Sequence, residues 1–305
     1  MPAFPIQAWV HAFRLRTLPL ALASVGTGIA MSYANHGFKA RVSLLTVFTT
    51  LFLQILSNLA NDFGDSVKGV DNSDRVGPER AMQNGSISTS SMKRGILLFV
   101  FLALGSGIWL IIEAFKDQNF TPTSILFFLV GLVSIAASIM YTVGKNPYGY
   151  YGFGDLFVFI FFGLVAVLGS YYLNTLELAA QHFLPAIAIG MLSTGVLNLN
   201  NMRDVENDTR FHKKTLVVKM GMKSARIYHS ILILGGLSLF LIYALMNFHH
   251  PLHYLFLLIY PLFILDWSKI LKITNHSELD PHLKKLAINT LLLVILFATG
   301  IILGN

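Results

Sequence analysis

Nine long stretches that lack Asp, Glu, Lys and Arg constrain this chain more than any other feature of its sequence. Each approaches or exceeds the roughly 17–25 residues that a helix needs to cross a bilayer. With 54% hydrophobic and only 12% charged residues, the chain has too little interior to hide these stretches in water. The sequence therefore predicts an all-α polytopic membrane protein and excludes a soluble enzyme. The expected spans are 17–38, 42–61, 95–112, 118–144, 156–176, 178–202, 227–248, 249–265 and 286–305.

The distribution of Lys and Arg predicts how these helices are oriented. If the N-terminus is cytoplasmic, 19 of the 22 basic residues lie in cytoplasmic segments, and only Lys39, Arg41 and Lys116 lie outside. Such a bias is the usual signature of membrane topology. The net charge of +7 thus has a topological explanation, and we expect membrane lipid but no nucleic acid as a partner. The first residues show no cleavable signal peptide, so we expect the first helix to direct insertion.

Acidic residues gather in two short segments instead of spreading along the chain. Eight of the 15 lie directly after the second and the sixth predicted helix. In a helix, Asn61 and Asp65 share one face, as do Asp204 and Asp208, because residues four apart are neighbours. Two matched sets of oxygen ligands are therefore expected at the same depth of the bundle.

The spacing of these segments also predicts the domain organisation. Four predicted helices separate them, which suggests two pseudo-repeated halves, roughly 10–145 and 150–285, each with one acidic site. With a last helix, the halves form a single domain over 1–305.

Carboxylates, amides and cations at the ends of two helices indicate a site for a metal ion and a diphosphate. Hard cations such as Mg²⁺ are usually held by carboxylates together with substrate phosphates, and Lys and Arg donate to phosphate oxygens. The alternative, two solvated loops with salt bridges, explains one acidic loop better than two matched ones. The absence of a GxxxxGK[ST] motif excludes a P-loop, and the absence of Cys excludes thiolate sites. The flanking cations are Lys68, Arg75, Arg80, Arg203, Arg210, Lys213 and Lys214.

At these residues the sequence resembles the UbiA-type superfamily of intramembrane aromatic prenyltransferases. That superfamily carries an NDxxDxxxD-like motif after the second helix and a DxxxD motif after the sixth. Asn61, Asp62 and Asp65 match the first motif, and Asp204 and Asp208 match the second.

The resemblance extends along essentially the whole chain and is closest to the naphthoate-prenylating branch. It is carried by the segments 14–28, 58–88, 141–155 and 200–221, of which the run DRVGPERAMQNGSIS is the most specific. Position 69 is Gly where a last Asp of the motif would fall, and Asp71 is the expected substitute.

The resemblance implies a UbiA-like bundle with a central apolar cavity and a defined reaction. A polyprenyl group passes from polyprenyl diphosphate to 1,4-dihydroxy-2-naphthoate, with loss of CO₂ and diphosphate and with Mg²⁺ as cofactor. Mg²⁺ and basic side chains would stabilise charge on the leaving group, and the apolar bundle would shield an allylic cation from water. The pathway implies a bacterial cytoplasmic (inner) membrane, with the active-site loops on the cytoplasmic side.

The resemblance also implies roles for particular residues. The expected metal ligands are Asn61, Asp62, Asp65, Asp71, Asp204 and Asp208. The expected catalytic residues are Asp65, Asp204, Asp208 and Lys145. The expected substrate-binding residues are Lys68, Arg75, Arg203, Lys213, Lys214, Tyr141, Tyr148, Asp155 and Arg14.

Several of these residues have a second interpretation. Each cation also serves as a determinant of topology, and tyrosines near helix ends also anchor a protein at the membrane interface. Arg14 either meets the naphthoate carboxylate or anchors the first helix. Lys145 contacts either diphosphate or the aromatic acid.

Other functions remain open at this point. Within the same fold, 4-hydroxybenzoate or haem is an alternative prenyl acceptor. A secondary transporter also combines repeats with polar groups, although its acids would lie near the midplane of the membrane. A purely structural membrane protein leaves the paired acidic motifs unexplained.

Overall fold

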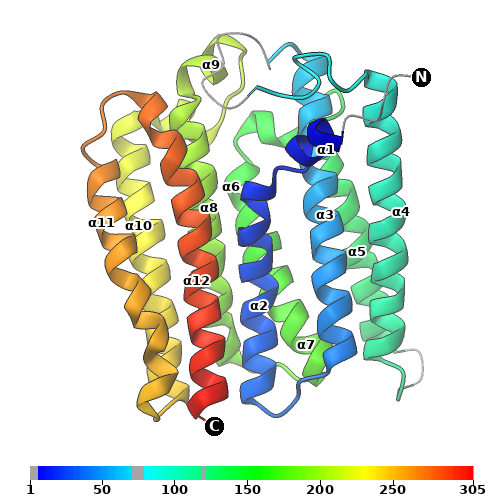
Figure 1. The fold of residues 1–305 in the computed structure, drawn as a ribbon, viewed down its shortest axis with the longest axis vertical. Coiled ribbons are helices and arrows are strands. Elements are labelled where there is room, and N and C mark those ends of the chain that lie inside the picture. The colour runs from blue at the N-terminus through cyan, green and yellow to red at the C-terminus, as the bar shows by residue number, and fades with distance from the viewer. Residues whose placement is uncertain (1–5, 71–78, 119–120, 305) are drawn as a thin grey trace.

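The protein is described here by a computed structural model that covers residues 6–70, 79–118 and 121–304, and every regular element in these ranges is helical (Figure 1). Nine helical segments within them are long and apolar enough to cross a membrane. The prediction of a nine-span, all-α polytopic protein is confirmed in number, order and class.

The elements follow one another as an up-and-down bundle of long helices with short helical connections. In chain order they are α1 (Ile6–Ala12), η1 (Leu15–Thr17), α2 (Leu18–Ala34), α3 (Ala40–Val67), α4 (Thr89–Ala114), α5 (Pro122–Met140), η2 (Tyr148–Tyr151), α6 (Gly154–Val158), the π-helical η3 (Phe159–Leu168), α7 (Gly169–Thr175), η4 (Ala180–His182), α8 (Phe183–Arg203), α9 (Val205–Arg210), α10 (Leu216–Asn247), η5 (Pro251–Ile259), α11 (Tyr260–Ile270), η6 (His276–Leu279) and α12 (Asp280–Gly304).

Some helices are longer than the charge-free stretches that predicted them. The last span, expected over 286–305, begins with η6 and α12, and the seventh, expected from 227, begins at Leu216. Charged side chains such as Lys284 and Lys285 continue these helices, because long cationic side chains can reach water from a helix end. A prediction that ends each helix at the first charged residue therefore makes the predicted helix too short at its polar end.

Local sequence explains where several helices begin. Thr121 and Ser124 form a capping box at the start of α5, with Pro122 in the first turn, where its missing N–H costs nothing. Thr215 caps α10 by accepting a hydrogen bond from the Val218 N–H at 3.4 Å. Further along α10, Gly221 has a positive φ of 76°, so the chain departs from helical geometry at that residue.

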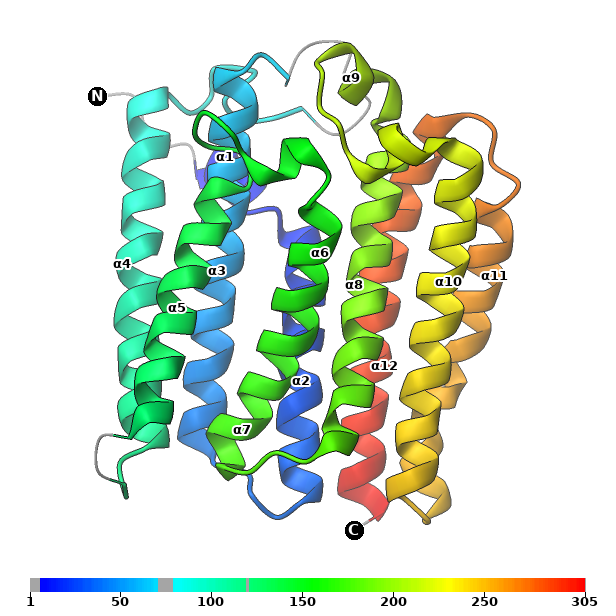
Figure 2. The same ribbon diagram turned by 180° about the vertical axis from the view of Figure 1, so that it is seen from behind.

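The two sides of the bundle differ in packing. The largest apolar core lies among α2, η3, α7, α8, α10, η5, α11 and α12, whereas smaller clusters join α3 to α1 and α4 (Figure 2). The span Ala180–Arg203, which contains α8, is mostly buried inside the protein, whereas α5 is mostly exposed. The C-terminal helices thus form a dense support, and the more open side is available for a cavity.

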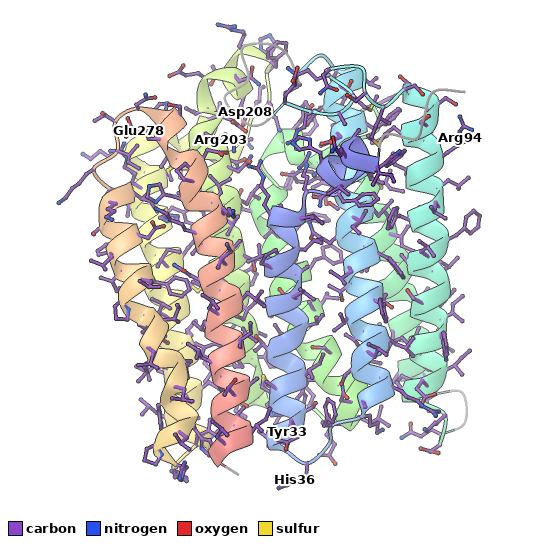
Figure 3. All side chains as sticks on the ribbon, in the orientation of Figure 1. Tyr33, His36, Arg94, Arg203, Asp208 and Glu278 are labelled. Atoms are coloured by element: carbon purple, nitrogen blue, oxygen red, sulfur yellow. The ribbon has the colours of Figure 1, made fainter. Side chains whose placement is uncertain are left out.

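One end of the bundle carries α1, α9 and η2 (Figures 1 and 2). Arg203 and Asp208 lie at this end, opposite to Tyr33 and His36 (Figure 3). We call it the acidic end, because both acidic segments, Asn61–Asp65 and Asp204–Asp208, lie there.

Candidate active site

A cavity of about 400 Å³ runs from the acidic end into the bundle. Its mouth is lined by side chains of both acidic segments, including Asn61, Asp65, Asp204 and Asp208. Deeper in the bundle, its walls are mostly apolar and come from α2 to α5, α6, η3, α7 and α8. The cavity therefore joins a charged mouth to an apolar interior.

A single helix, α5, supplies one wall of this cavity. Gly131, Ser134 and Ser138 line the cavity from one of its faces. Leu129 and Val133, on the same helix, are 51% and 57% exposed. Cavity and surroundings are thus separated by the thickness of one helix.

In the first acidic segment, Asp62 is held by two arginines. Its carboxylate is 1% exposed, forms an ion pair with Arg14, and lies 3.4 Å from Arg80 Nη1. Both arginines line the cavity, whereas Asp62 lies behind them, outside the lining. Asp62 thus joins guanidinium groups from two different parts of the chain at this wall.

The chain around Arg14 is fixed by hydrogen bonds from α3. Arg14 itself has a left-handed backbone, with a φ of 50°, which is uncommon for a residue other than Gly. Asn58 Nδ2 donates to the Phe13 carbonyl at 2.9 Å and to Thr17 Oγ1 at 3.0 Å, on either side of it. These contacts hold Arg14 in the turn that directs its side chain toward Asp62.

Asn61 and Asp65 face the cavity and have neutral partners. Asn61 Oδ1 accepts a hydrogen bond from Thr142 Oγ1 at 3.3 Å, and Asp65 Oδ1 accepts one from Tyr150 Oη at 2.7 Å. Gly64 allows this close approach, because a Cβ at that position would lie 2.5 Å from Thr142 Oγ1. The end of α3 is thereby packed against the segment that follows α5.

In the second acidic segment, Asp204 is clamped by its neighbour in sequence. Arg203 Nε and Nη2 each lie 2.7 Å from one oxygen of Asp204, in the two-pronged geometry typical of arginine and carboxylate. The Arg203 side chain is fully buried, and it also contacts Asn200 Oδ1 at 2.9 Å and the carboxylate of Asp280. Asp204 lines the cavity, whereas Arg203 supports it from behind.

Asp208 is buried and has one carboxylate oxygen without a hydrogen-bond partner among the described residues. This oxygen is Oδ2, whereas Oδ1 lies 3.9 Å from Lys213 Nζ. Burial raises the pKa of Asp208 to about 7, although the charge of Lys213 acts in the opposite direction. For Lys213, burial alone would lower the pKa, but the nearby Asp65 and Asp208 outweigh it and the pKa is raised.

These residues fit a Mg²⁺ ion that takes some of its oxygen ligands from the protein and the others from a substrate phosphate. Asp65, Asp208 and Asn61 offer oxygen atoms at the cavity mouth, and the unpartnered Asp208 oxygen is available to an ion. Within the described ranges, no three His, Cys, Asp or Glu side chains form a complete metal-binding cluster. Mg²⁺ usually takes one or two protein carboxylates together with substrate phosphates, so the donor set suits it.

Other residues predicted from the sequence occupy several different environments. Tyr141 and Tyr148 line the cavity. Burial raises the pKa of Tyr141 to about 12, and the Tyr148 ring stacks on Phe157 at 4.0 Å while its hydroxyl donates to the Ala137 carbonyl. Lys145 is exposed in the loop before η2.

The remaining predicted residues lie around the mouth or away from it. Asp155 is buried beside Tyr228, outside the cavity lining. Lys68 and Lys214 are exposed at the acidic end, and the Lys214 N–H donates to the Tyr150 carbonyl at 2.9 Å. Asp71 and Arg75 lie outside the described residues.

Two residues join the site in ways that the sequence does not predict. The sequence indicates Arg80 only as one of the cations that could donate to phosphate, and Tyr150 only as a tyrosine near a helix end. For Arg80, the specific run DRVGPERAMQNGSIS was an available signal. For Tyr150, the sequence gives only Gly149 and Gly152, which allow a tight turn; φ is 83° at Gly152.

The fold and the site together define an integral membrane protein with one long cavity that is charged at its mouth and apolar below. The chain belongs to the UbiA prenyltransferase family, which matches residues 21–289. It is 41% identical to the 1,4-dihydroxy-2-naphthoate octaprenyltransferase of Escherichia coli strain K12, over 98% of this chain and 96% of that protein. Identity is also 41% to the Haemophilus influenzae protein of the same name, over 98% and 97%.

Solved structures show the same fold at lower sequence identity. A UbiA homolog from Archaeoglobus fulgidus, bound to DMAPP and Mg²⁺, aligns with a TM-score of 0.63 and 17% identity. The alignment covers 96% of this chain and 99% of that one. The family and fold implied by the sequence motifs are therefore confirmed.

Proposed function

We propose that this protein transfers a polyprenyl group from a polyprenyl diphosphate to 1,4-dihydroxy-2-naphthoate. The observation that carries the proposal is the convergence of both acidic segments, with Lys213 between them, on the mouth of one apolar cavity. Two relatives that are 41% identical over nearly their full lengths bear the name 1,4-dihydroxy-2-naphthoate octaprenyltransferase. They favour a naphthoate acceptor over 4-hydroxybenzoate.

The acidic end would bind the diphosphate of the donor. Lys213 supplies an ammonium group that the surrounding acids keep protonated, and Asp65 and Asp208 face the same space. Mg²⁺, when bound between carboxylates and phosphate oxygens, would neutralise charge that develops on the leaving diphosphate. The fully buried Arg203 holds Asp204 in place from behind.

The reaction then breaks the prenyl C–O bond and the C–C bond between the ring and its carboxylate, and it forms one new C–C bond. The electron pair of the prenyl C–O bond leaves with the diphosphate, and the ring carbon that bears the carboxylate attacks the allylic carbon. Loss of CO₂ returns the carboxylate's bonding electrons to the ring, so the atoms and electrons balance without an oxidant. The apolar walls of η3 and α5 would hold the prenyl chain and keep water from the allylic cation.

The acceptor carries a carboxylate, and the wall formed by Arg14 and Arg80 offers the complementary charge. Both arginines line the cavity, so the carboxylate of an acceptor that entered it would meet their guanidinium groups. This arrangement supports an acidic aromatic acceptor.

A labelled-substrate assay tests the proposal directly. Purified protein in detergent is given Mg²⁺, radiolabelled polyprenyl diphosphate and either 1,4-dihydroxy-2-naphthoate or 4-hydroxybenzoate. Labelled product with the naphthoate alone, lost on addition of EDTA, supports the reaction, the acceptor and the cofactor together. Product with 4-hydroxybenzoate alone would overturn the acceptor, and no product with either would overturn the reaction and favour a transporter.

We further propose that the acidic end faces the cytoplasm of a bacterial inner membrane. The excess of Lys and Arg in the segments assigned to that side supports this orientation. Because the chain has no Cys, single variants Glu206→Cys and His36→Cys report on the two ends without background. An impermeant thiol reagent added to intact cells should label the second variant and spare the first, and the reverse pattern would invert the topology.

A further inference from the structure

Tyr150 contacts the first acidic segment and the lysines that follow each segment, yet nothing in the proposed reaction uses it. Its hydroxyl donates to Asp65 Oδ1 at 2.7 Å. Two ammonium groups lie over its ring, with Lys68 Nζ at 4.3 Å and Lys213 Nζ at 5.2 Å from the ring centroid. One aromatic residue therefore joins a carboxylate that faces the cavity to two cations from different parts of the chain.

The backbone around Tyr150 is fixed on both sides. The Gly149 N–H donates to the Tyr141 carbonyl at 3.0 Å, and a Cβ on Gly149 would lie 2.7 Å from the same oxygen. After Tyr150, its own carbonyl accepts from the Lys214 N–H, and Lys219 Nζ donates to the Tyr151 carbonyl at 2.7 Å. Hydrogen bonds of the neighbouring backbone therefore hold the Tyr150 ring between α3 and the start of α10.

The charges around the ring explain why such a residue is needed. Burial lowers the pKa of Lys68, the charge of Asp65 raises it, and the charge of Lys213, which repels Lys68, lowers it. The negative face of an aromatic ring attracts cations and so offsets part of this repulsion. A tyrosine hydroxyl bonded to a metal-ligating carboxylate also fixes the orientation of that ligand.

We propose that Tyr150 is a positioning residue for the diphosphate site. Its hydroxyl orients Asp65 toward Mg²⁺, and its ring holds Lys68 and Lys213 where both ammonium groups reach one diphosphate. The inference rests on the proposed function, because it assumes that a diphosphate and Mg²⁺ bind at this mouth. In this proposal the hydroxyl of Tyr150 orients the metal ligand, and its ring positions the two lysines.

Two substitutions separate the tasks. Tyr150→Phe removes the hydroxyl and keeps the ring, and Tyr150→Leu removes both. Tyr151→Phe is the matched control, because the Tyr151 hydroxyl in the same turn bonds to the loop residue Asn146 at 3.2 Å and is exposed. Thermal unfolding in the same detergent reports whether each variant keeps its fold.

The readout is binding of inorganic diphosphate to the full-length protein, measured by calorimetry over a range of Mg²⁺ concentrations. For Tyr150→Phe we expect the Mg²⁺ concentration at half-maximal binding to rise about tenfold. Diphosphate affinity at saturating Mg²⁺ should stay unchanged. Tyr150→Leu should show the same Mg²⁺ shift and, in addition, about tenfold weaker diphosphate binding at saturating Mg²⁺. Tyr151→Phe should match the wild type in both quantities.

The outcomes keep this inference distinct from the proposed function. Suppose that the wild type binds diphosphate with Mg²⁺ and that Tyr150→Phe and Tyr150→Leu both bind it as tightly as the wild type does. The inference is then overturned and the proposed function stands. The inference is likewise overturned if these variants lose only thermal stability. If the wild type binds no diphosphate at any Mg²⁺ concentration, both fail. Combining Tyr150→Leu with Lys68→Met should cost less than the two separate losses predict, because the ring then has one cation fewer to hold.

Discussion

In the first acidic segment, the buried Asp62 is held by arginines from two distant parts of the chain, whereas in the second, Asp204 is held mainly by the arginine beside it. In both, the acid one turn further along meets a weaker partner: Tyr150 for Asp65, and Lys213 at 3.9 Å for Asp208. Each segment therefore combines one clamped carboxylate with one that is open to a ligand.

The two segments differ in how far along the chain the arginines that bind their buried carboxylates lie, and this difference indicates which segment depends more on tertiary structure. The contacts of Asp62 join α3 to the chain before α2 and to the segment before α4, so they form only when these elements have packed. The two-pronged contact of Arg203 with Asp204 is local, and its tertiary part is the contact with Asp280. We expect changes in the first segment to affect folding more, and changes in the second to affect activity more.

The largest expected effect is on stability, from Asp62→Asn. Removing this carboxylate leaves Arg14 and Arg80 largely buried without their shared counter-charge, which typically costs about 3–5 kcal/mol. Thermal unfolding of the purified protein measures the loss. A variant with wild-type stability but no prenyl transfer would instead assign Asp62 to the metal site, as the sequence motif implied.

The second effect is on activity, from Asp208→Asn. The amide cannot replace an ionised ligand, and loss of one such electrostatic contribution typically lowers kcat about 10²–10³-fold. Prenyl transfer measured with labelled donor provides the test, with the exposed Glu206→Gln of the same helix as a control that keeps activity.

Stability distinguishes this loss from misfolding. Burial disfavours the ionised form of Asp208 and raises its pKa to about 7, so at pH 8 the metal-free protein bears the cost of a buried charge. Asn carries no charge, and the variant should therefore unfold no earlier than the wild type at pH 8 in EDTA. Earlier unfolding would mean that Asp208 is a structural residue.

A smaller effect on stability is expected from Gly64→Ala. The new Cβ would lie 2.5–2.8 Å from atoms of Thr142, one of them in the backbone, so α3 must shift, at a cost of about 1–3 kcal/mol. Gly105→Ala in α4 is the control, because its Cβ would meet nothing within 4 Å. Equal unfolding temperatures for the two variants would refute tight packing at the first segment.

The smallest effect is expected from Arg203→Lys. Lysine keeps the charge but cannot make the two-pronged contact with Asp204, so we expect kcat to fall about tenfold while the protein stays folded. The steady-state kinetics of prenyl transfer measure this change. A variant with unchanged kcat would show that the orientation of Asp204 does not limit the reaction.

The sequence predicted the parts of this structure that depend on short-range patterns. Nine spans follow from charge-free stretches, and the common depth of Asp65 and Asp208 follows from their positions after the second and sixth helices. The partners of these acids could not be predicted. Arg14 reaches Asp62 because Asn58 holds an unusual backbone turn 44 residues earlier in the chain, and no local pattern encodes that contact.

Asp155 and Lys145 illustrate the same limit. Asp155 was expected near the substrate because it lies in a segment that resembles the family, but its side chain faces Tyr228 in the packed side of the bundle. Helix direction can be inferred from sequence, whereas the face that a short, irregular span such as α6 and η3 presents depends on its neighbours. Lys145 lies in an exposed loop, where its role stays a prediction.

Because α5 alone forms one wall of the cavity, the surrounding lipid lies close enough to affect the shape of the cavity. A chain that fills the cavity is separated from the bilayer by about 10–12 Å, the diameter of one helix with its side chains. The lipid or detergent that contacts Leu129 and Val133 therefore affects the shape of the apolar part of the cavity. The carboxylates at the mouth of the cavity are far from this contact. Detergent micelles and bilayers should consequently give the same diphosphate affinity and different turnover for long-chain donors, so rates measured in one medium do not carry over to the other.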